Sequence, residues 1–209
     1  MSVPSNPSRS GRQSKSSGQV RIIAGQWRGR RLPVANAPGL RPTGDRVRET
    51  LFNWLQSDIA GSHCLDLFAG TGALGLEALS RYAASVTFVE PDLQANRMLV
   101  DALKLFGIDE TARLEQGCDT RVVQTSAELF LAENQTQFDI VFIDPPFDQA
   151  LQMATLASLW PDHLSKSAVI YVEAPTKQAW VDPAPPGYTS RKEKRFGEVC
   201  ARLLDVCSV

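Results

Sequence analysis

The sequence predicts an α/β protein with a mostly parallel sheet, helices on both faces of that sheet, and an antiparallel hairpin at one edge. From His63 onward, short apolar runs of strand length alternate with helix-length segments, which is typical of repeated βα units. A glycine-rich turn separates the first of these strands from its helix. The C-terminal segment GYTSRKEKRFGEVCARLLDV instead predicts two long strands that turn at Phe196–Gly197.

A hairpin and an amphipathic helix are expected before the alternating part. Two β-prone runs, Val20–Ala24 and Arg31–Val34, are joined through glycines, which predicts a β-hairpin with a basic tip. The segment DRVRETLFNWL then begins with Asp45, a residue type that favours helix N-caps. Its apolar residues share one helical face: Val47, Leu51, Trp54 and Leu55. Trp54 is therefore expected in the core.

The alternating part supplies five strands and four helices before the C-terminal pair. The expected strands are Cys64–Phe68, Val86–Glu90, Arg121–Thr125, Phe138–Asp144 and Ala168–Glu173. The expected helices are Ala73–Tyr82, Leu93–Phe106, Ala127–Glu133 and Ala150–Leu159. Residues 107–120 are ambiguous between these types.

Charge is distributed unevenly along the 209 residues, although the net charge is only −1. Residues 1–44 contain no acid and eight bases: Arg9, Arg12, Lys15, Arg21, Arg28, Arg30, Arg31 and Arg41. The remaining fourteen of the 22 basic residues share the rest of the chain with all 23 acidic residues. A basic segment on an acidic body indicates a polyanionic partner. Residues 1–19, rich in Ser, Gly and Pro, are expected to be disordered, and a solubilising tail explains them equally well.

Composition argues against several classes of protein. No apolar run approaches the ~20 residues of a membrane span, and the N-terminus lacks the apolar stretch of a secretory signal. The four cysteines have neither metal-ligand nor redox spacing: Cys64, Cys118, Cys200 and Cys207. With only two histidines in the chain, no zinc or other metal site is expected. These features indicate a cytoplasmic protein with reduced thiols.

The glycine loop carries the first functional signal. Gly70, Gly72 and Gly75 have the G-x-G-x-x-G spacing that nicotinamide and flavin enzymes share. Glu90, at the end of the next strand, can hold a ribose diol in these enzymes also. Asp66, four residues before Gly70, favours a ligand with a cationic end, because a carboxylate repels pyrophosphate. S-adenosylmethionine has such an end and NAD does not. The alternative is a tight strand–helix turn without a ligand.

The second functional signal is a motif at the end of the expected strand Phe138–Asp144. The carboxyl ends of strands are where open α/β sheets bind ligands. The motif consists of Asp144, Pro145, Pro146 and Phe147. A carboxylate and a neighbouring carbonyl that accept both N–H bonds of an exocyclic amine favour the pyramidal nitrogen that attacks a methyl group. Prolines stiffen these acceptors, and Phe147 offers a ring face to a base removed from its stack. In isolation, a simple proline turn would explain the motif.

Four segments together resemble one bacterial family, the type D small-subunit ribosomal RNA methyltransferases. They are RIIAGQWRGRRL, LRPTGDRVRETLFNWL, LDLFAGTGALGLEALSRYA and VFIDPPF, and the resemblance extends from about Val20 to the C-terminus. It implies a Rossmann-like class I methyltransferase fold with a seven-stranded sheet, and S-adenosylmethionine as the cofactor. It also implies methylation of N2 of one specific guanine in 16S ribosomal RNA.

The resemblance assigns roles to individual residues. Cofactor binding is implied for Asp66, Phe68, Gly70, Thr71, Gly72, Glu90, Ser126 and Ala127, and catalysis for Asp144, Pro145, Pro146 and Phe147. For the adenine contact, Asp119 competes with Ser126 and Ala127. RNA binding is expected of Arg21, Trp27, Arg28, Arg30, Arg31, Arg41, Arg46 and Arg48.

Some of these RNA assignments have structural alternatives. Trp27 is explained equally well by packing of the hairpin on the body, and Arg46 and Arg48 by a solvated helix face. The basic run Arg191, Lys192, Lys194 and Arg195 is more often a solvated strand face.

The expected organisation is a disordered basic tail (1–19), a hairpin and RNA-binding arm (20–44), and a methyltransferase domain (45–209). The expected partner is 16S ribosomal RNA within the small subunit, and the protein is expected to be a monomer without membrane contact. One alternative is a DNA or RNA adenine-N6 methyltransferase, although no insertion is long enough for a separate target-recognition region. Another is a non-catalytic RNA-binding assembly factor, against which Asp66, Glu90 and Asp144 argue.

Overall fold

The computed structural model describes residues 19–33, 44–108, 120–146, 151–159, 161–177 and 184–207. Disorder was predicted for residues 1–19, of which only Gln19 is described, and Gln19 belongs to the strand Gln19–Arg21. The predicted roles of Arg41, Asp119 and Phe147 lie outside the described residues.

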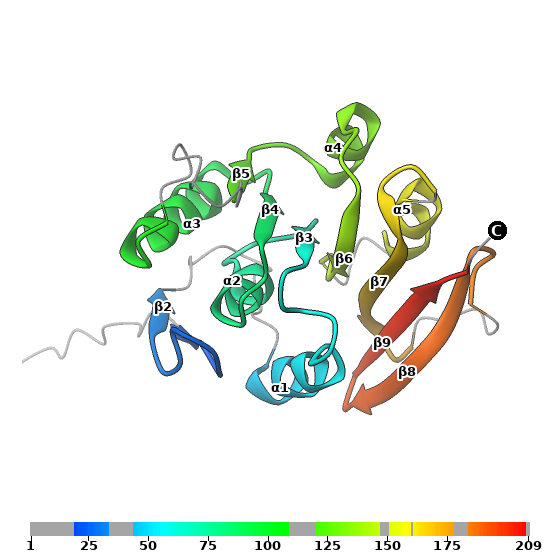
Figure 1. Cartoon of the computed structure of the whole chain (residues 1–209), viewed down its shortest axis with the longest axis horizontal. Helices are drawn as coiled ribbons and strands as arrows, with labels where there is room; N and C mark the ends of the chain where they lie inside the picture. Colours follow the sequence, from blue (N-terminus) through cyan, green and yellow to red (C-terminus); the bar gives the residue numbers. More distant parts are fainter. Residues whose placement is uncertain are drawn as a thin grey trace, which may run out of the picture.

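A seven-stranded sheet runs through the centre of the molecule (Figure 1). Its strands are β3 (His63–Asp66), β4 (Ser85–Val89), β5 (Arg121–Val123), β6 (Phe138–Ile143), β7 (Leu164–Pro175), β8 (Tyr188–Phe196) and β9 (Val199–Val206). Their spatial order is β5-β4-β3-β6-β7-β9-β8. The first five strands in this order, from β5 to β7, pair in parallel with their neighbours. Strand β9 pairs antiparallel with both β7 and β8. The predicted mostly parallel sheet with an antiparallel C-terminal hairpin is confirmed.

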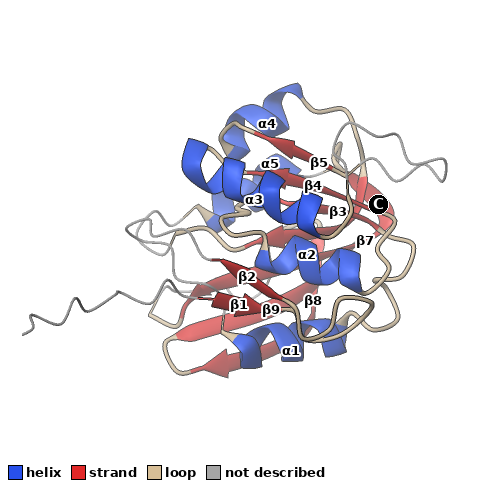
Figure 2. Cartoon of the chain, turned by 90° about the vertical axis from the view of Figure 1, so that its left-hand side faces the viewer, coloured by secondary structure: helices blue, strands red, loops and turns tan. Residues whose placement is uncertain are grey.

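Helices cover both faces of the sheet (Figures 1 and 2). They are α1 (Asp45–Trp54), α2 (Ala73–Ser80), α3 (Leu93–Leu105), α4 (Ala127–Glu133) and α5 (Gln152–Leu159). Because successive strand residues point to opposite faces, Phe88 and Phe142 pack with α1, α2 and α3, while Val141 and Ile143 pack with α4 and α5. Burial on both faces explains why β6 is an unbroken apolar run apart from Asp139.

The N-terminal hairpin packs beside α1 and α2 (Figures 1 and 2). Its strands, β1 (Gln19–Arg21) and β2 (Arg31–Pro33), pair antiparallel as predicted. Val20, Ile22 and Leu32 are buried in the same apolar cluster as α1 and α2. A Cβ on Gly25 would lie 1.8 Å from the carbonyl oxygen of Ser80, so only glycine permits this close approach to α2. The hairpin therefore shares its core with α1, α2 and the sheet.

Several boundaries differ from the prediction. Gly44, not Asp45, is the N-cap of α1, because the Asp45 carboxylate pairs with Arg48 one turn later instead of capping the helix. Trp54 is only partly buried against the core. Strand β7 begins at Leu164, before the predicted Ala168, and its later part is paired along β9 as far as Pro175.

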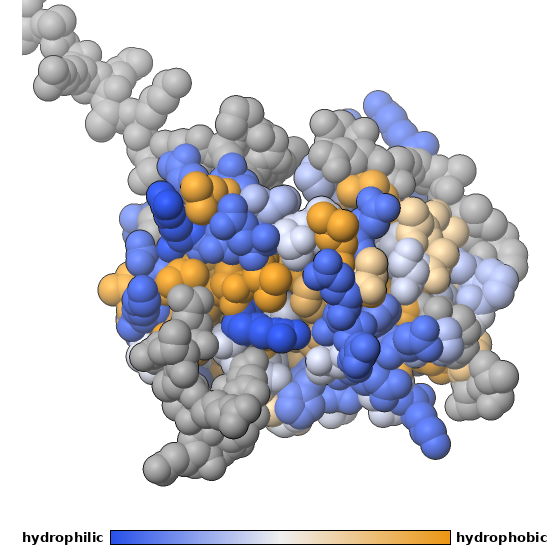
Figure 3. Space-filling view, turned by 90° about the horizontal axis from the view of Figure 1, so that it is seen from above, coloured by the Kyte–Doolittle hydropathy of each residue, from blue (hydrophilic) through white to orange (hydrophobic). Residues whose placement is uncertain are grey.

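The described surface and thiols are unexceptional. Within the described ranges, no helix has the length and apolar character needed to cross a membrane. On the face seen from above, hydrophilic residues surround small apolar patches (Figure 3). Cys64 and Cys200 are buried, Cys207 is partly buried, and all three are free thiols.

Candidate active site

The sheet changes winding direction between β3 and β6. Strands β3 and β4 lead into α2 and α3 on one face, whereas β6 is followed by α5 on the other face. Open α/β sheets bind ligands at such a point, beyond the carboxyl ends of the strands. Asp66 ends β3, Glu90 follows β4, and Asp144 follows β6. The structure thus brings three predicted site residues to the expected place.

Strand register places these three acids on one face. Asp66 is level with Phe88 on β4 and with Phe142 on β6. Glu90 and Asp144 each come two residues later, so they point to the same face as Asp66, one step further along the strands. This is the face that carries α1, α2 and the hairpin.

Asp66 is a buried carboxylate with a raised pKa. It is 2% exposed, and its Oδ2 accepts the N–H of Gly75 at 3.0 Å. Its pKa is raised to about 7, mainly by burial and to a smaller extent by the charges of Asp144 and Glu90. Hydrogen bonds from the backbone of Gly75 and Phe68 oppose this shift. A nearby cation would therefore favour the ionised form of Asp66.

The glycine loop turns directly from Asp66 into α2. Gly70 and Gly72 have positive φ angles of 51° and 73°, a conformation that glycine adopts at least cost. A Cβ on Gly75 would lie 2.2 Å from the ring of Phe88, so the third glycine lets α2 pack closely on β4. Phe68 and Thr71, which were also assigned to the cofactor, are partly exposed in this loop.

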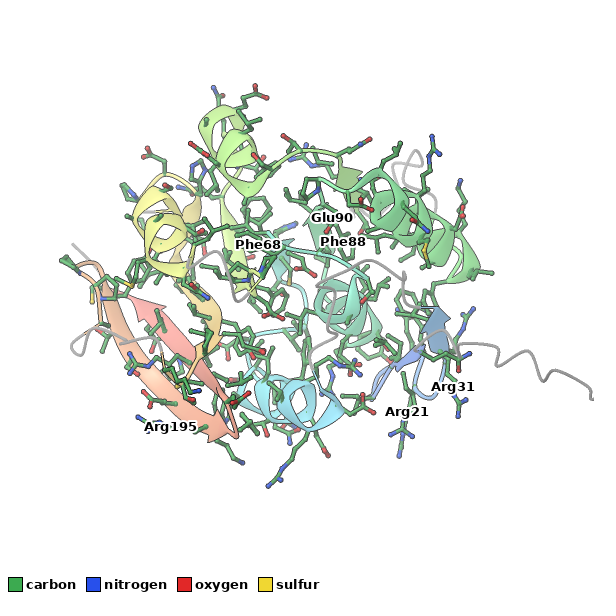
Figure 4. The ribbon with its side chains drawn as sticks, turned by 180° about the vertical axis from the view of Figure 1, so that it is seen from behind. Arg21, Arg31, Phe68, Phe88, Glu90 and Arg195 are labelled. Atoms are coloured by element: carbon green, nitrogen blue, oxygen red, sulfur yellow. The ribbon has the colours of Figure 1, made fainter. Side chains whose placement is uncertain are left out.

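Glu90 joins the glycine loop to the start of α3. Its Oε2 accepts the N–H of Gly70 at 2.7 Å, and its Oε1 accepts the N–H of Asp92 at 2.8 Å. Burial raises the pKa of Glu90, these two hydrogen bonds lower it, and the charge of Asp92 raises it. Each carboxylate oxygen can accept a second hydrogen bond. Figure 4 shows Glu90 near Phe68 and Phe88, and its ribose contact stays a prediction.

Asp144 is half-buried at the start of the D-P-P-F motif. Pro145 is buried and Pro146 is exposed. Burial is the main cause of the raised pKa values of Asp66 and Tyr171, and the charge of Asp144 contributes to both. The catalytic role of Asp144 is untested by this geometry, but its location agrees with it.

Ser126 and Ala127 lie at the carboxyl side of β5, the strand next to β4. Ser126 is the N-cap of α4, and its Oγ accepts the N–H of Leu129 at 3.3 Å. Both residues are partly exposed. Their predicted adenine contact therefore remains open.

A buried network connects the hairpin to α1 and α2. Glu77 on α2 is fully buried, and its two carboxylate oxygens accept the N–H groups of Ile23 and Ala24 at 2.7 and 3.0 Å. Arg81 donates to Glu77 at 2.8 Å, and Arg48 on α1 lies 3.8 Å from it.

The prediction that Arg48 binds RNA is wrong. Its side chain is 0% exposed, and it donates to the carbonyl of Arg21 at 2.8 Å and to Asp45 at 2.6 Å. A side chain held in this way beneath the hairpin cannot reach a phosphate. The alternative of a solvated helix face fails for Arg48 as well.

Trp27 and Arg30 attach the hairpin to α3. The Trp27 ring stacks on Phe106 with 4.5 Å between centroids, and the Arg30 guanidinium lies 4.2 Å from the centre of the Phe106 ring. Arg30 also donates to the carbonyl of Leu105 at 2.5 Å. For Trp27 these contacts support the packing alternative over RNA stacking.

The other described arginines of the predicted RNA surface are exposed. They are Arg21, Arg28, Arg31 and Arg46, of which Figure 4 shows Arg21 and Arg31 pointing away from the body. On β8, Arg191 pairs with Asp58 and Asp205. Its neighbours Lys192, Lys194 and Arg195 are exposed.

Two buried acids were not singled out from the sequence. Glu77 is the one charged residue in the helix ALGLEALS, whose other residues are apolar or small. A charged residue within such a buried helix indicates a buried partner, because an unpaired charge is costly to bury. Glu173 ends the apolar run AVIYVE on β7, the strand beside β6. An acid at the end of an apolar strand is the signal that identified Asp144, and it applies to Glu173 equally.

Comparison with known proteins identifies the family of this chain. The family model described as conserved hypothetical protein 95 matches residues 20–205. A protein from Escherichia coli (strain K12) named ribosomal RNA small subunit methyltransferase D is 49% identical over 189 residues, which cover 90% of each chain. A Haemophilus influenzae protein of the same name is 47% identical over 190 residues, covering 89% of this chain and 93% of that protein.

A solved structure shares the fold over nearly the whole chain. This candidate methyltransferase from Escherichia coli superposes with a TM-score of 0.78 at 45% identity, covering 92% of this chain and 100% of that one. The fold is therefore the Rossmann-like class I methyltransferase fold that the resemblance implied. The chain belongs to the family described as conserved hypothetical protein 95, that of the type D small-subunit ribosomal RNA methyltransferases.

Proposed function

We propose that this protein transfers a methyl group from S-adenosylmethionine to the exocyclic N2 of one guanine in 16S ribosomal RNA. The observation that carries the proposal is the arrangement of Asp66, Glu90 and Asp144 on one face at the carboxyl edge of β3, β4 and β6. The names of the relatives support ribosomal RNA as the substrate class.

The residues present fit S-adenosylmethionine. The ligand carries a cationic amino acid end, and Asp66 is a buried acid whose ionised form such an end would stabilise. Glu90 would hold the ribose diol through the second acceptor positions of its oxygens. Ser126 and Ala127 would lie toward the adenine. When bound, the cofactor supplies an electrophilic methyl group.

Asp144 and the backbone that follows it would act on the target amine. The Asp144 carboxylate and the neighbouring carbonyl accept the two N–H bonds, which draws the nitrogen lone pair out of conjugation with the base. Pro145 and Pro146 restrict the backbone that carries these acceptors, so little reorganisation accompanies the reaction. No strong base is required, because the methylated amine cation loses its proton readily.

The exposed arginines of the hairpin would contact the RNA backbone. Arg21, Arg28 and Arg31 are exposed on the hairpin, whose buried residues pack on the face of the sheet that carries the three acids. We expect the substrate to be the RNA within the small ribosomal subunit and the enzyme to act as a monomer.

The proposal is tested with labelled S-adenosylmethionine and small subunits that lack the modification. After digestion of the RNA to nucleosides, we expect the label in N2-methylguanosine. Label in N6-methyladenosine would instead support an adenine methyltransferase. Absence of transfer, with retained RNA binding, would support a non-catalytic assembly factor.

Cofactor binding is expected to depend on pH through Asp66. Its folded pKa of about 7 lies above the ordinary 3.8, so the folded protein retains a proton that a cationic ligand must displace below pH 7. We expect affinity to fall about tenfold between pH 8 and pH 6 from this group alone. Titration calorimetry of the wild-type protein and of Asp66→Asn at both pH values isolates the contribution of Asp66. The ligand's own titration affects the two proteins equally, so it cancels in the comparison. Equal pH dependence in the two proteins would contradict the assignment.

The same group has the opposite effect on the stability of the ligand-free protein. Because the folded pKa is raised, the contribution of Asp66 is present below pH 4 and is lost as the pH rises through about 7.

Glu90→Gln is expected to weaken S-adenosylmethionine binding by about 1.5–3 kcal/mol, the worth of one hydrogen bond to a charged group. Glutamine retains a single carbonyl acceptor, so the N–H groups of Gly70 and Asp92 and the ribose diol compete for it. RNA affinity should be nearly unchanged. Calorimetry with the exposed Glu128→Gln as control checks this result. Unchanged cofactor affinity would remove Glu90 from the cofactor site.

Arg28→Ala with Arg31→Ala is expected to weaken RNA binding and flatten its salt dependence. Each lost phosphate contact reduces the log–log salt slope by about 0.7–0.9. Point substitutions are needed because deletion of the hairpin would also remove buried core residues. The control is Lys166→Ala, exposed near the amino end of β7 on the opposite edge. An unaltered slope in the double variant would show that the hairpin does not contact phosphate.

A further inference from the structure

A fourth acid, Glu173, lies beside Asp144 at the carboxyl edge of the sheet. Strands β6 and β7 pair in parallel, with Phe142 opposite Tyr171 and Ile143 opposite Val172. One residue further along each strand, Asp144 and Glu173 are level with each other. Because Phe142 and Tyr171 belong to the same core cluster, both acids point to the face of the sheet that carries Asp66.

The Glu173 side chain is buried, and a hydrogen bond from Tyr171 fixes its orientation. The residue is 4% exposed, and its Oε2 accepts the hydroxyl of Tyr171 at 2.9 Å. Tyr171 itself is fully buried. Burial and the charges of Glu173 and Asp144 raise the pKa of Tyr171 well above its ordinary value, so its hydroxyl stays a donor. Contact with Tyr171 thus holds the carboxylate in one orientation.

The backbone of Glu173 is held as well. Gln152 on α5, itself buried, donates to the carbonyl oxygen of Glu173 at 3.2 Å. Side chain and backbone are therefore anchored by two different elements, β7 and α5. Such support is what a group that reads a substrate by hydrogen bonding requires.

Two neighbouring carboxylates match the Watson–Crick edge of guanine. Guanine presents its N1–H directly beside the N2 amino group, so it offers a row of donors. Adenine presents an N1 lone pair beside its N6 amino group, and a carboxylate opposite that lone pair repels it. Substrate discrimination is greatest where a buried polar group loses its partner with the wrong substrate.

We propose that Glu173 is the residue that selects guanine, accepting its N1–H while Asp144 accepts from its N2 amino group. This inference rests on the proposed guanine-N2 methylation and adds the residue that reads the base. Glu173 takes no part in the transfer itself: no bond to it forms or breaks.

The test compares guanine with 2-aminopurine at the target position of reconstituted small subunits. 2-Aminopurine keeps the N2 amino group, but its N1 is an acceptor without hydrogen. The wild-type protein is expected to prefer guanine by about 100-fold in kcat/KM. In Glu173→Gln, the amide NH₂ can donate to N1 of 2-aminopurine, so this preference should fall at least about tenfold. Because the preference is a ratio of two kcat/KM values measured with the same protein, differences in the fraction of active enzyme cancel.

Controls separate base reading from support of the site. Tyr171→Phe removes the hydroxyl that orients Glu173 and should lower the rate on guanine, with the preference reduced less than in Glu173→Gln. A Glu173→Gln protein with the wild-type preference overturns the inference. If Glu173→Gln fails to fold, the wild-type protein alone still tests the inference. Equal kcat/KM of the wild-type protein on guanine and on 2-aminopurine overturns the inference. Failure of the wild-type protein to methylate guanine at all would instead overturn the proposed function.

Discussion

Asp144→Ala is expected to slow methyl transfer about 100- to 1000-fold, the usual cost of losing one preorganised electrostatic contact to the reacting group. The half-buried carboxylate acts on the amine, so cofactor and RNA binding should persist. The measurement is single-turnover transfer from labelled S-adenosylmethionine to small subunits that lack the modification.

The matched control for this experiment is Asp162→Ala, an exposed acid that precedes β7 at the opposite edge of the sheet. It should transfer at the wild-type rate. If Asp144→Ala also transfers at the wild-type rate, the D-P-P-F segment is only a turn and the catalytic interpretation fails.

Glu77→Ala is expected to lower the free energy of unfolding by about 3–5 kcal/mol, the range for removing one partner of a buried ion pair. The change removes the acceptor of two backbone N–H groups and the acid that Arg48 and Arg81 face. Urea denaturation followed by circular dichroism measures the loss. The exposed Glu49→Ala on α1 provides the control.

Hydrogen exchange distinguishes local from global effects of Glu77→Ala. If the hairpin detaches alone, the amides of Ile23 and Ala24 should exchange faster while those of β6 remain protected. A loss below about 1 kcal/mol without faster exchange would show that Glu77 does not hold the hairpin.

The fold was largely predictable because its signals are local. Each βα unit carries its own apolar period, and the first also carries a glycine turn, so these signals do not depend on the order of the strands in the sheet. Boundaries were less predictable, because they depend on partners. Strand β7 begins early because Leu164 pairs with Phe138 of β6, and it continues to Pro175 because β9 pairs along its later part. The N-cap of α1 was misplaced by one residue because Asp45 pairs with Arg48 instead.

The site was predictable where one short motif supplies both position and chemistry, as for Asp66, Glu90 and Asp144. Residues whose roles depend on distant partners were not. Arg48 has the sequence context of a surface base, but Glu77 and the Arg21 carbonyl, far away in the chain, bury it. The sequence marks Glu173 as an acid at the end of an apolar strand, but only the pairing of β7 with β6 places it beside Asp144.

We propose that the carboxyl edge carrying Asp66, Glu90 and Asp144 methylates N2 of one guanine in 16S ribosomal RNA. This proposal is tested most directly by mapping methylated nucleotides in ribosomal RNA from cells with and without this protein. We predict that one guanine of 16S RNA loses its N2-methyl group without the protein. The mark should return with the wild-type protein but not with Asp144→Ala. Identical methylation maps, or the loss of an adenine mark instead, would contradict the account.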